Sequence, residues 1–220
     1  ILWQNLSTGH AHLNIMQGTT LIGQQGITGS TTTKRIAGTA DVNRDGNLDI
    51  VWYDTAPGPG QGRVYVWFMQ PRASAYGFPI AGNAGPNNTH SGGFIVDGNG
   101  VPVSIGGAEG ELGGLGDFNA DQVVDIAWQN TATGEVRVWY LNGLIRYYNA
   151  FITAVPLGWR LASVGDILGD SKLDVVWQYV DGTLAFYSLT YNPSGPSSLD
   201  PVPITSGGAI DPGWRLVGPK

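Results

Sequence analysis

A nine-residue acidic segment occurs three times in this chain of 220 residues, and each copy leads directly into a short apolar segment that contains a tryptophan. The three copies are Asp41–Asp49, Asp117–Asp125 and Asp166–Asp174, and the tryptophans that follow them are Trp52, Trp128 and Trp177. One such unit cannot bury its apolar face alone, so copies have to pack against each other. The repeat therefore restricts the chain to folds that are arrays of similar elements.

The spacing of the tryptophans gives the length of the repeat. Trp3 and Trp52 are 49 residues apart, and Trp128 and Trp177 are again 49 residues apart. A period of about 40–50 residues is typical of the blade of a β-propeller. The interval from Trp52 to Trp128 is 76 residues, which indicates an insertion within about residues 71–110 of the second unit. We expect one domain over residues 1–220 with this insertion in it.

The third unit predicts four short strands, at residues 125–129, 135–141, 144–152 and 158–164. Its first segment alternates with period two, and Asn142-Gly143 is a hairpin turn signal. Four short antiparallel strands make one blade. The sequence therefore predicts an all-β fold, a β-propeller of about four blades. Pairing of Ile1-Leu2-Trp3 with Trp214–Val217 could close the ring, and a fragment of a larger ring is the alternative.

Charge is concentrated in the three acidic segments, which hold nine of the 17 Asp and Glu residues. The net charge is −6, so three divalent cations would neutralise it. The 11 Lys and Arg residues form no basic run, which argues against a nucleic-acid partner.

The absence of cysteine excludes disulfides and thiolate metal sites. No apolar stretch is long enough to span a membrane. The chain begins with Ile1 and has no signal peptide, so we expect a processed chain or a fragment, which fits secretion.

Oxygen-bearing side chains stand at alternate positions of the acidic segments, numbered 1 to 9 from the first Asp. Calcium takes about six to eight oxygen ligands, so this pattern suits it. An EF-hand would need Glu at position 12, where this chain has Trp52, and flanking helices, which the sequence does not predict. Plain turn chemistry is the other alternative, because Asp, Asn and Gly all favour turns.

The third unit also carries a family resemblance. Gly116-Asp117-Phe118-Asn119-Ala120-Asp121, followed by Asp125-Ile126-Ala127-Trp128 and later by Gly158-Trp159-Arg160-Leu161, resembles the FG-GAP/VCBS repeat. This family includes the integrin α-subunit propeller, fungal integrin-like propeller lectins and many secreted bacterial proteins. The resemblance covers the chain apart from the insertion and is strongest in the third unit.

The resemblance implies that each acidic segment joins the first two strands of a blade and binds calcium through side chains at positions 1, 3, 5 and 9 and the carbonyl at position 7. We expect two calcium sites and a weaker third, in which Leu168 supplies no oxygen and Lys172 adds positive charge. In the second, Gln122 replaces the turn glycine. The implied ligands are Asp41, Asn43, Asp45, Asn47 (carbonyl) and Asp49; Asp117, Asn119, Asp121, Val123 (carbonyl) and Asp125; and Asp166, Asp170, Lys172 (carbonyl) and Asp174.

The recurring tryptophans are predicted to be core residues, whereas aromatic residues outside the repeat are candidates for ligand binding. These candidates are Tyr76, Phe78, Tyr147 and Tyr148. The three histidines, His10, His12 and His90, lack an evident third ligand for a transition metal.

No catalytic motif is present, so the sequence favours a binding module over an enzyme. By resemblance to the propeller lectins, we expect a secreted, calcium-stabilised module that recognises carbohydrate or a cell-surface glycoprotein. Two alternatives stay open: a protein adhesion module that uses the insertion, and a part of a polysaccharide-active enzyme.

Overall fold

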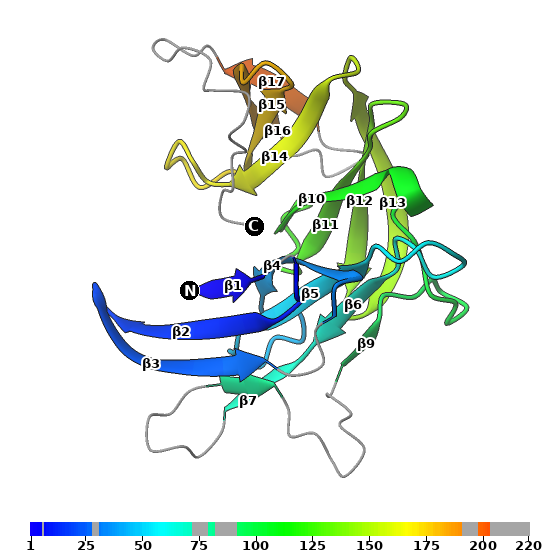
Figure 1. Ribbon diagram of the computed structural model, residues 1–220. Helices are drawn as coiled ribbons and strands as arrows, with labels where there is room; N and C mark the ends of the chain where they lie inside the picture. The colour runs from blue at the N-terminus through cyan, green and yellow to red at the C-terminus, as the bar shows by residue number, and fades with distance from the viewer. Residues whose placement is uncertain (6, 28–30, 72–78, 82–91, 191–197, 203–220) are drawn as a thin grey trace.

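The protein is described here by a computed structural model, which covers all residues except 6, 28–30, 72–78, 82–91, 191–197 and 203–220 (Figure 1). In this part of the chain every regular element is a β-strand apart from a 3-10 turn at Gly107–Glu109. Sheet 1 contains β1 (Leu2–Gln4), β2 (Ala11–Gln17) and β3 (Thr20–Ile27); sheet 2 contains β4 (Lys34–Ala40), β5 (Asp49–Asp54), β6 (Val64–Trp67) and β9 (Gly92–Phe94). Sheet 3 contains β10 (Gly110–Gly116), β11 (Asp125–Asn130), β12 (Glu135–Asn142) and β13 (Ile145–Ala154); sheet 4 contains β14 (Trp159–Gly165), β15 (Asp174–Tyr179), β16 (Leu184–Thr190) and β17 (Ser198–Val202).

Neighbouring strands in each sheet are antiparallel and follow one another along the chain, except that β7 and β8 lie between β6 and β9 in the sequence. The predicted all-β fold of antiparallel four-stranded sheets is thus confirmed, and the predicted strands of the third unit match β11 to β14 within about two residues. The first sheet has three strands in the described part of the chain. These residues do not show a closed ring of sheets.

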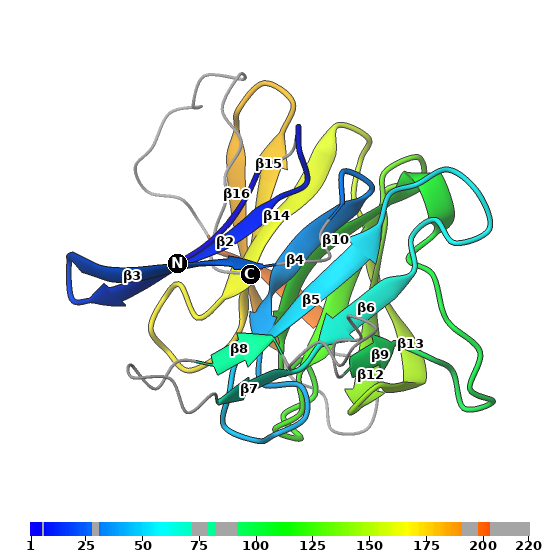
Figure 2. The ribbon, with the colours of Figure 1, turned by 60° about the horizontal axis from the view of Figure 1, so that its bottom comes forward.

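The sheets succeed one another around the molecule, with sheets 1 and 2 at the bottom of Figure 1, sheet 3 at the right and sheet 4 at the top. The first strands of sheets 2, 3 and 4, which are β4, β10 and β14, lie side by side near the middle of Figure 2. Glycine makes this approach possible in β10: a Cβ on Gly113 would lie 2.0 Å from Cδ2 of Leu161, and one on Gly114 would lie 2.6 Å from Cβ of Val164. Gly113 is also the extra residue of a β-bulge, between the paired residues Leu112 and Gly114.

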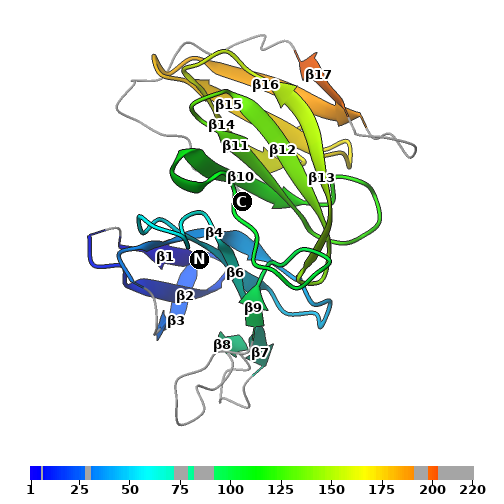
Figure 3. The same cartoon turned by 90° about the vertical axis from the view of Figure 1, so that its right-hand side faces the viewer.

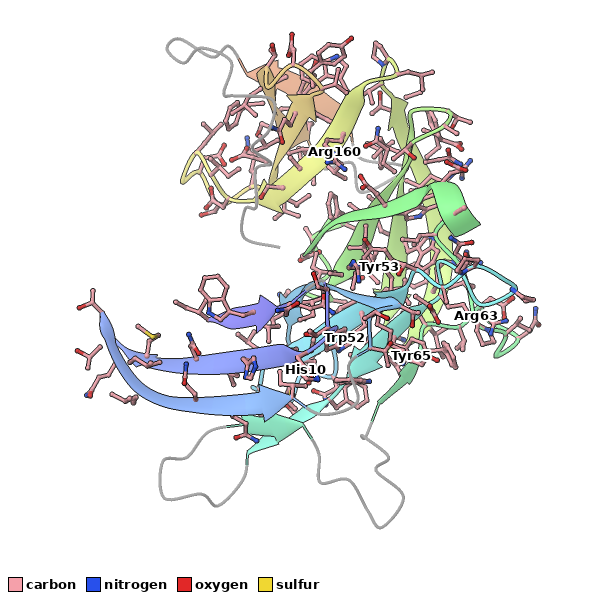
Figure 4. The ribbon with its side chains drawn as sticks, in the orientation of Figure 1. His10, Trp52, Tyr53, Arg63, Tyr65 and Arg160 are labelled. Atoms are coloured by element: carbon pink, nitrogen blue, oxygen red, sulfur yellow. The ribbon has the colours of Figure 1, made fainter. Side chains whose placement is uncertain are left out.

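Each contact between successive sheets holds a hydrophobic core, and a repeated tryptophan lies in each one. Trp52 packs with residues of sheets 1 and 2, Trp128 with residues of sheets 2 and 3, and Trp177 with residues of sheets 3 and 4. Figure 4 shows Trp52 and Tyr65 to the right of the strands of sheet 1, among the strands of sheet 2. The alternation of strand side chains produces this pattern: Ile126 and Trp128 face one core while Ala127 faces the next. The predicted structural role of these three tryptophans is confirmed.

A glutamine links each of two sheet pairs, and of the two Gln129 is buried and Gln4 is partly buried. Gln129, on β11, donates from Nε2 to the carbonyl of Trp159 at 2.8 Å and accepts from the amide of Leu161 at 2.7 Å. Gln4, on β1, makes the same pair of bonds with the carbonyl of Lys34 and the amide of Ile36. Each glutamine directly follows a repeated tryptophan, so one sequence position fixes the register between a sheet and the first strand of the next.

Trp3 differs from the other repeated tryptophans. Its side chain is 57% exposed, whereas Trp52, Trp128 and Trp177 are at most 6% exposed. Trp52, Trp128 and Trp177 are each covered by the preceding sheet, whereas no described sheet covers Trp3 in this way. The face of sheet 1 that carries Trp3 therefore has open apolar surface.

The predicted insertion contributes to sheet 2 as well as projecting from it. Gly92–Phe94 forms β9, the fourth strand of the sheet, and pairs with β6. The small hairpin predicted around Asp97–Gly100 has a turn in which the amide of Gly100 donates to the carbonyl of Asp97 at 2.9 Å. Strands β7 (Met69–Pro71) and β8 (Pro79–Ala81) form a separate hairpin at the bottom of Figure 3. Among the described residues, no helix is long and apolar enough to cross a membrane.

Candidate functional site

The three acidic segments are the loops that join the first and second strands of sheets 2, 3 and 4. Loop 1 (Asp41–Asp49) connects β4 to β5, loop 2 (Asp117–Asp125) connects β10 to β11, and loop 3 (Asp166–Asp174) connects β14 to β15. Since each loop has the same place in its sheet, the loops stand at equivalent edges. Loops 1 and 2 touch, because Nη2 of Arg44 donates to the carbonyl of Asp121 at 3.3 Å.

One set of hydrogen bonds shapes all three loops, and loop 2 illustrates it. Asp117, at position 1, accepts from the amide of Asp121 at 3.1 Å and from the amide of Gln122 at 2.8 Å. Asp121, at position 5, accepts from the amide of Val123 at 2.8 Å. The same bonds join the equivalent residues Asp41, Asp45, Gly46 and Asn47 in loop 1 and Asp166, Asp170, Ser171 and Lys172 in loop 3.

Positions 4 and 6 of every loop have left-handed backbone conformation. Gly46 and Gly169 adopt it, and so do four residues with side chains: Arg44, Ala120, Gln122 and Ser171, with φ between 58° and 65°. Gln122 therefore keeps the conformation that a glycine would take at position 6, at the steric cost that left-handed backbone imposes on residues with Cβ. The carboxylate at position 1, which accepts from the amides of positions 5 and 6, holds this turn.

The carboxylate at position 9 is buried in all three loops, at 0–1% exposure for Asp49, Asp125 and Asp174. In loop 2, Asp125 accepts from the amides of Phe118 and Leu141, both at 3.0 Å, and so ties the loop to the third strand of its sheet. Asp49 makes the equivalent bonds with the amides of Val42 and Met69.

Burial changes the ionisation of these carboxyl groups. Exclusion of water raises the pKa of Asp125 to about 7, against the lowering effect of the amides of Leu141 and Phe118. The charges of Asp121 and Asp117 raise this pKa further. Burial also raises the pKa of Asp49. By contrast, the backbone amide and the side chain of Asn47 lower the pKa of the exposed Asp45. A cation near a position-9 carboxylate would favour its ionised form.

Loop 3 differs from the other two in the hydrogen bonds of its position-9 carboxylate and in the oxygen atoms that it offers. Asp174 accepts from the amides of Ile167 and Leu168 through Oδ2, but its buried Oδ1 has no hydrogen-bond partner in the described part of the chain. The amide of Leu189 bonds instead to the carbonyl of Leu173 at 2.8 Å. Leu168, at position 3, supplies no oxygen, and Nζ of Lys172 lies 3.7 Å from Oδ2 of Asp170.

The donor chemistry of loops 1 and 2 fits a hard cation. Each offers carboxylate or amide oxygens at positions 1, 3 and 5 and a carbonyl at position 7, which is the ligand type that calcium prefers. Over the residues that the structure describes, no three His, Asp or Glu side chains gather into a compact metal-binding group. The position-9 carboxylates are instead engaged by backbone amides in loops 1 and 2.

Tyr147 and Tyr148 lie beside loop 2 and are about half exposed. The strand pairing shifts between Tyr140 and Leu141, which makes Tyr147 the extra residue of a β-bulge. Consequently both side chains lie near Tyr140, with ring centroids 6.3 Å and 5.8 Å from it. The hydroxyl of Tyr147 accepts from Nδ2 of Asn119 at 2.7 Å and donates to Oδ2 of Asp121 at 3.3 Å. Burial, followed by the charge of Asp121, raises the pKa of Tyr147 to about 12.

The other candidates are not seen beside loop 2 among the described residues. Tyr76, Phe78 and His90 lie outside the described residues. His10 and His12 are exposed at the start of the β2 hairpin, and Figure 4 shows His10 in sheet 1.

A pocket of about 620 Å³ lies between loops 2 and 3. Its lining comprises Asp117, Phe118 and Ala120 from loop 2, Asp166, Ser171, Lys172 and Leu173 from loop 3, and Leu189 and Thr190 from β16. The sequence did not indicate this pocket, because its walls come from two repeats and a distant strand. A local difference that accompanies the pocket is at position 4, where loop 1 has Arg44 and loop 2 has Ala120.

No protein-family model, no curated protein and no solved structure matches this chain.

Proposed function

We propose that this chain is a secreted, calcium-stabilised β-propeller module that binds carbohydrate through the exposed Tyr147 and Tyr148, which pack on the buried Tyr140 beside loop 2. The observation that carries the proposal is the placement of Tyr140, Tyr147 and Tyr148 next to a loop rich in oxygen ligands. The propeller, the calcium and the carbohydrate are separate steps of the proposal, and each has its own support.

The propeller is supported by the way in which the sheets follow one another. Their first strands are neighbours, and each core is shared by consecutive sheets. Gln178 follows Trp177 as Gln129 follows Trp128, and Trp214-Arg215-Leu216 repeats Trp159-Arg160-Leu161. Residues 213–217, which lie outside the described part of the chain, would then pair with β1 and supply the first strand of sheet 1. Sheet 4 would then cover the face that carries Trp3.

Calcium is supported by the donor set of loops 1 and 2. Asp41, Asn43, Asp45 and the carbonyl of Asn47 would hold the ion in loop 1, and Asp117, Asn119, Asp121 and the carbonyl of Val123 in loop 2, with Asp49 and Asp125 behind them. Loop 3, with Asp166, Asp170, Asp174 and the carbonyl of Lys172, would bind more weakly. A bound ion supplies charge neutralisation at each acidic loop. Extracellular modules bind calcium with dissociation constants of about 10⁻⁴–10⁻³ M, and we expect loops 1 and 2 to bind it in this range.

Removal of calcium should destabilise the protein, because an ion that binds the folded state alone stabilises it by mass action. We expect the melting temperature in 2 mM calcium, roughly 2 to 20 times dissociation constants in this range, to fall in EGTA by an amount equivalent to about 0.6–1.8 kcal/mol per site. Asp121→Asn should reduce the shift, and the matched change Asp181→Asn, in the turn after β15, should leave it intact. A melting curve that is the same in calcium and EGTA would contradict calcium binding.

Carbohydrate binding is supported by the tyrosine cluster. Aromatic rings with one exposed face offer a flat apolar surface, and their hydroxyl groups add a polar edge. Tyr148 is half exposed and stacks on Tyr140 at an interplanar angle of 28°. Asn119 and Asp121, which contact the hydroxyl of Tyr147, would add hydrogen bonds to sugar hydroxyls at the rim of this surface.

A glycan array probed with the calcium-loaded protein tests this step. We expect binding to a limited set of glycans and a loss of at least tenfold in affinity for Tyr148→Ala, about 1.4 kcal/mol. Phe151→Ala is the matched control, because Phe151 is an equally exposed aromatic residue on the same strand. An array without hits, or equal losses for both variants at unchanged melting temperature, would contradict the carbohydrate site while leaving the calcium test intact.

A further inference from the structure

The gap between loops 1 and 2 and the gap between loops 2 and 3 are filled differently. In the first gap, Arg44 at position 4 reaches across and donates to the carbonyl of Asp121, at position 5 of the next loop. In the second gap, position 4 is Ala120, whose methyl group cannot reach or donate. The pocket of about 620 Å³ lies there, and Ala120 is part of its wall.

The far wall of the pocket includes the residues of loop 3 that directly follow position 5, the position whose carbonyl Arg44 contacts in loop 2. Asp121 and Asp170 occupy position 5 of loops with the same internal hydrogen bonds. Ser171 and Lys172, which directly follow Asp170, line the pocket. The carbonyl of Asp170 is therefore the counterpart of the carbonyl that accepts from Arg44.

The rest of the lining suits a side chain with an apolar stem and a cationic head. Phe118, Leu173 and Leu189 provide apolar surface for methylene groups, as arginine stems require. Asp117 and Asp166 bring negative charge to both sides of the pocket, while their carboxylate oxygens accept from amides of their own loops. Lys172 brings one positive charge to the lining, but its Nζ lies 3.7 Å from the Asp170 carboxylate. A volume of this size is within the usual range of small-ligand pockets.

We propose that this pocket binds a guanidinium group from outside the molecule, such as the arginine side chain of a peptide, in the place that Arg44 fills between loops 1 and 2. The guanidinium presents five N–H donors in a planar fork, which can reach a carbonyl and a carboxylate together. The pocket shares no residue with the tyrosine cluster, so this inference does not rest on carbohydrate binding.

Titration of ¹⁵N-labelled protein with N-acetyl-arginine methylamide, in calcium-containing buffer, tests the proposal. We expect saturable shifts of the amide signals of Ala120, Ser171 and Thr190. The lysine analogue should bind about tenfold more weakly, because an ammonium group lacks the planar arrangement of donors. Failure of the arginine probe to saturate, or equal affinity for the lysine analogue, would overturn the proposal.

Ala120→Arg should abolish binding by placing a guanidinium in the pocket from within. Ala132→Arg is the matched control, since it makes the same change at another exposed alanine, in the turn between β11 and β12. Melting curves establish that both variants are folded. Retention of binding by the Ala120→Arg variant would overturn the assignment of the pocket.

Discussion

Ser171 shows how much a single residue contributes to the shape of a loop. It occupies position 6 of loop 3 with φ of 65°, where loop 1 has Gly46. A serine pays a steric cost in this conformation that a glycine does not. Ser171→Gly should therefore raise the free energy of unfolding by about 0.5–1 kcal/mol, measured by urea denaturation.

The neighbouring Lys172 is the control for this change, because its φ is not positive. Lys172→Gly should lower stability, since glycine there only adds conformational freedom to the unfolded chain. A destabilising effect of Ser171→Gly would show that backbone strain at position 6 is not significant.

Single residues also show what the sequence could and could not predict about the site. The spacing of Asp117, Asp121 and Asp125 correctly placed the three carboxylates in one loop between two strands. It could not predict that Asp125 would bond the amide of Leu141, because this contact depends on the register of a strand 16 residues away. The β-bulge that turns Tyr147 toward loop 2 has no local sequence signal.

The close approach of β10 and β14 depends on Gly113. Gly113→Ala would place a methyl group 2.0 Å from Cδ2 and 2.9 Å from Cβ of Leu161, so the two strands would have to separate. We expect a loss of about 1–3 kcal/mol in the free energy of unfolding, measured by chemical denaturation.

Gly26→Ala is a suitable control, because Gly26 also lies within a strand and an added methyl group there meets nothing within 4 Å. It should be neutral or slightly stabilising. If Gly113→Ala is equally neutral, the packing of the first strands is looser than the distances indicate. Partial rescue by Leu161→Ala would identify the contact directly.

The sequence predicted most strands because the repeat unit alternates with period two. It did not predict β9, since Gly92-Gly93-Phe94 has one apolar side chain and no alternation. This strand is defined by its pairing with Tyr65 and Val66 on β6. Strands that follow an irregular insertion are set by their partner strand, which a local pattern does not contain.

Closure of the sheets into a ring is a property of the whole molecule, and a disulfide can test it. In sheet 4, Arg160 pairs with Gln178 across β14 and β15. The same register would pair Arg215 with Gln4. The chain has no cysteine, so Gln4→Cys with Arg215→Cys should give one intramolecular disulfide after oxidation, detected by mobility on a non-reducing gel.

Gln17→Cys with Arg215→Cys is the control, because Gln17 ends β2 away from the proposed pairing. Only the first pair should cross-link within a monomer. Cross-linking only between chains would indicate that a second copy supplies the missing strand, and no cross-linking would argue against the proposed register.

The left-handed residues of the loops have a further consequence for how such repeats diverge. Glycine fills only two of the six left-handed positions, Gly46 and Gly169, while the aspartates at positions 1, 5 and 9 occur in every copy. The fold of the loop is thus encoded by three acidic residues, of which the outer pair stands eight positions apart, followed by a buried strand. A search pattern that requires glycine at position 6 would find loop 1 and pass over loops 2 and 3. A pattern built on the aspartate pair and the tryptophan three residues after it would find all three.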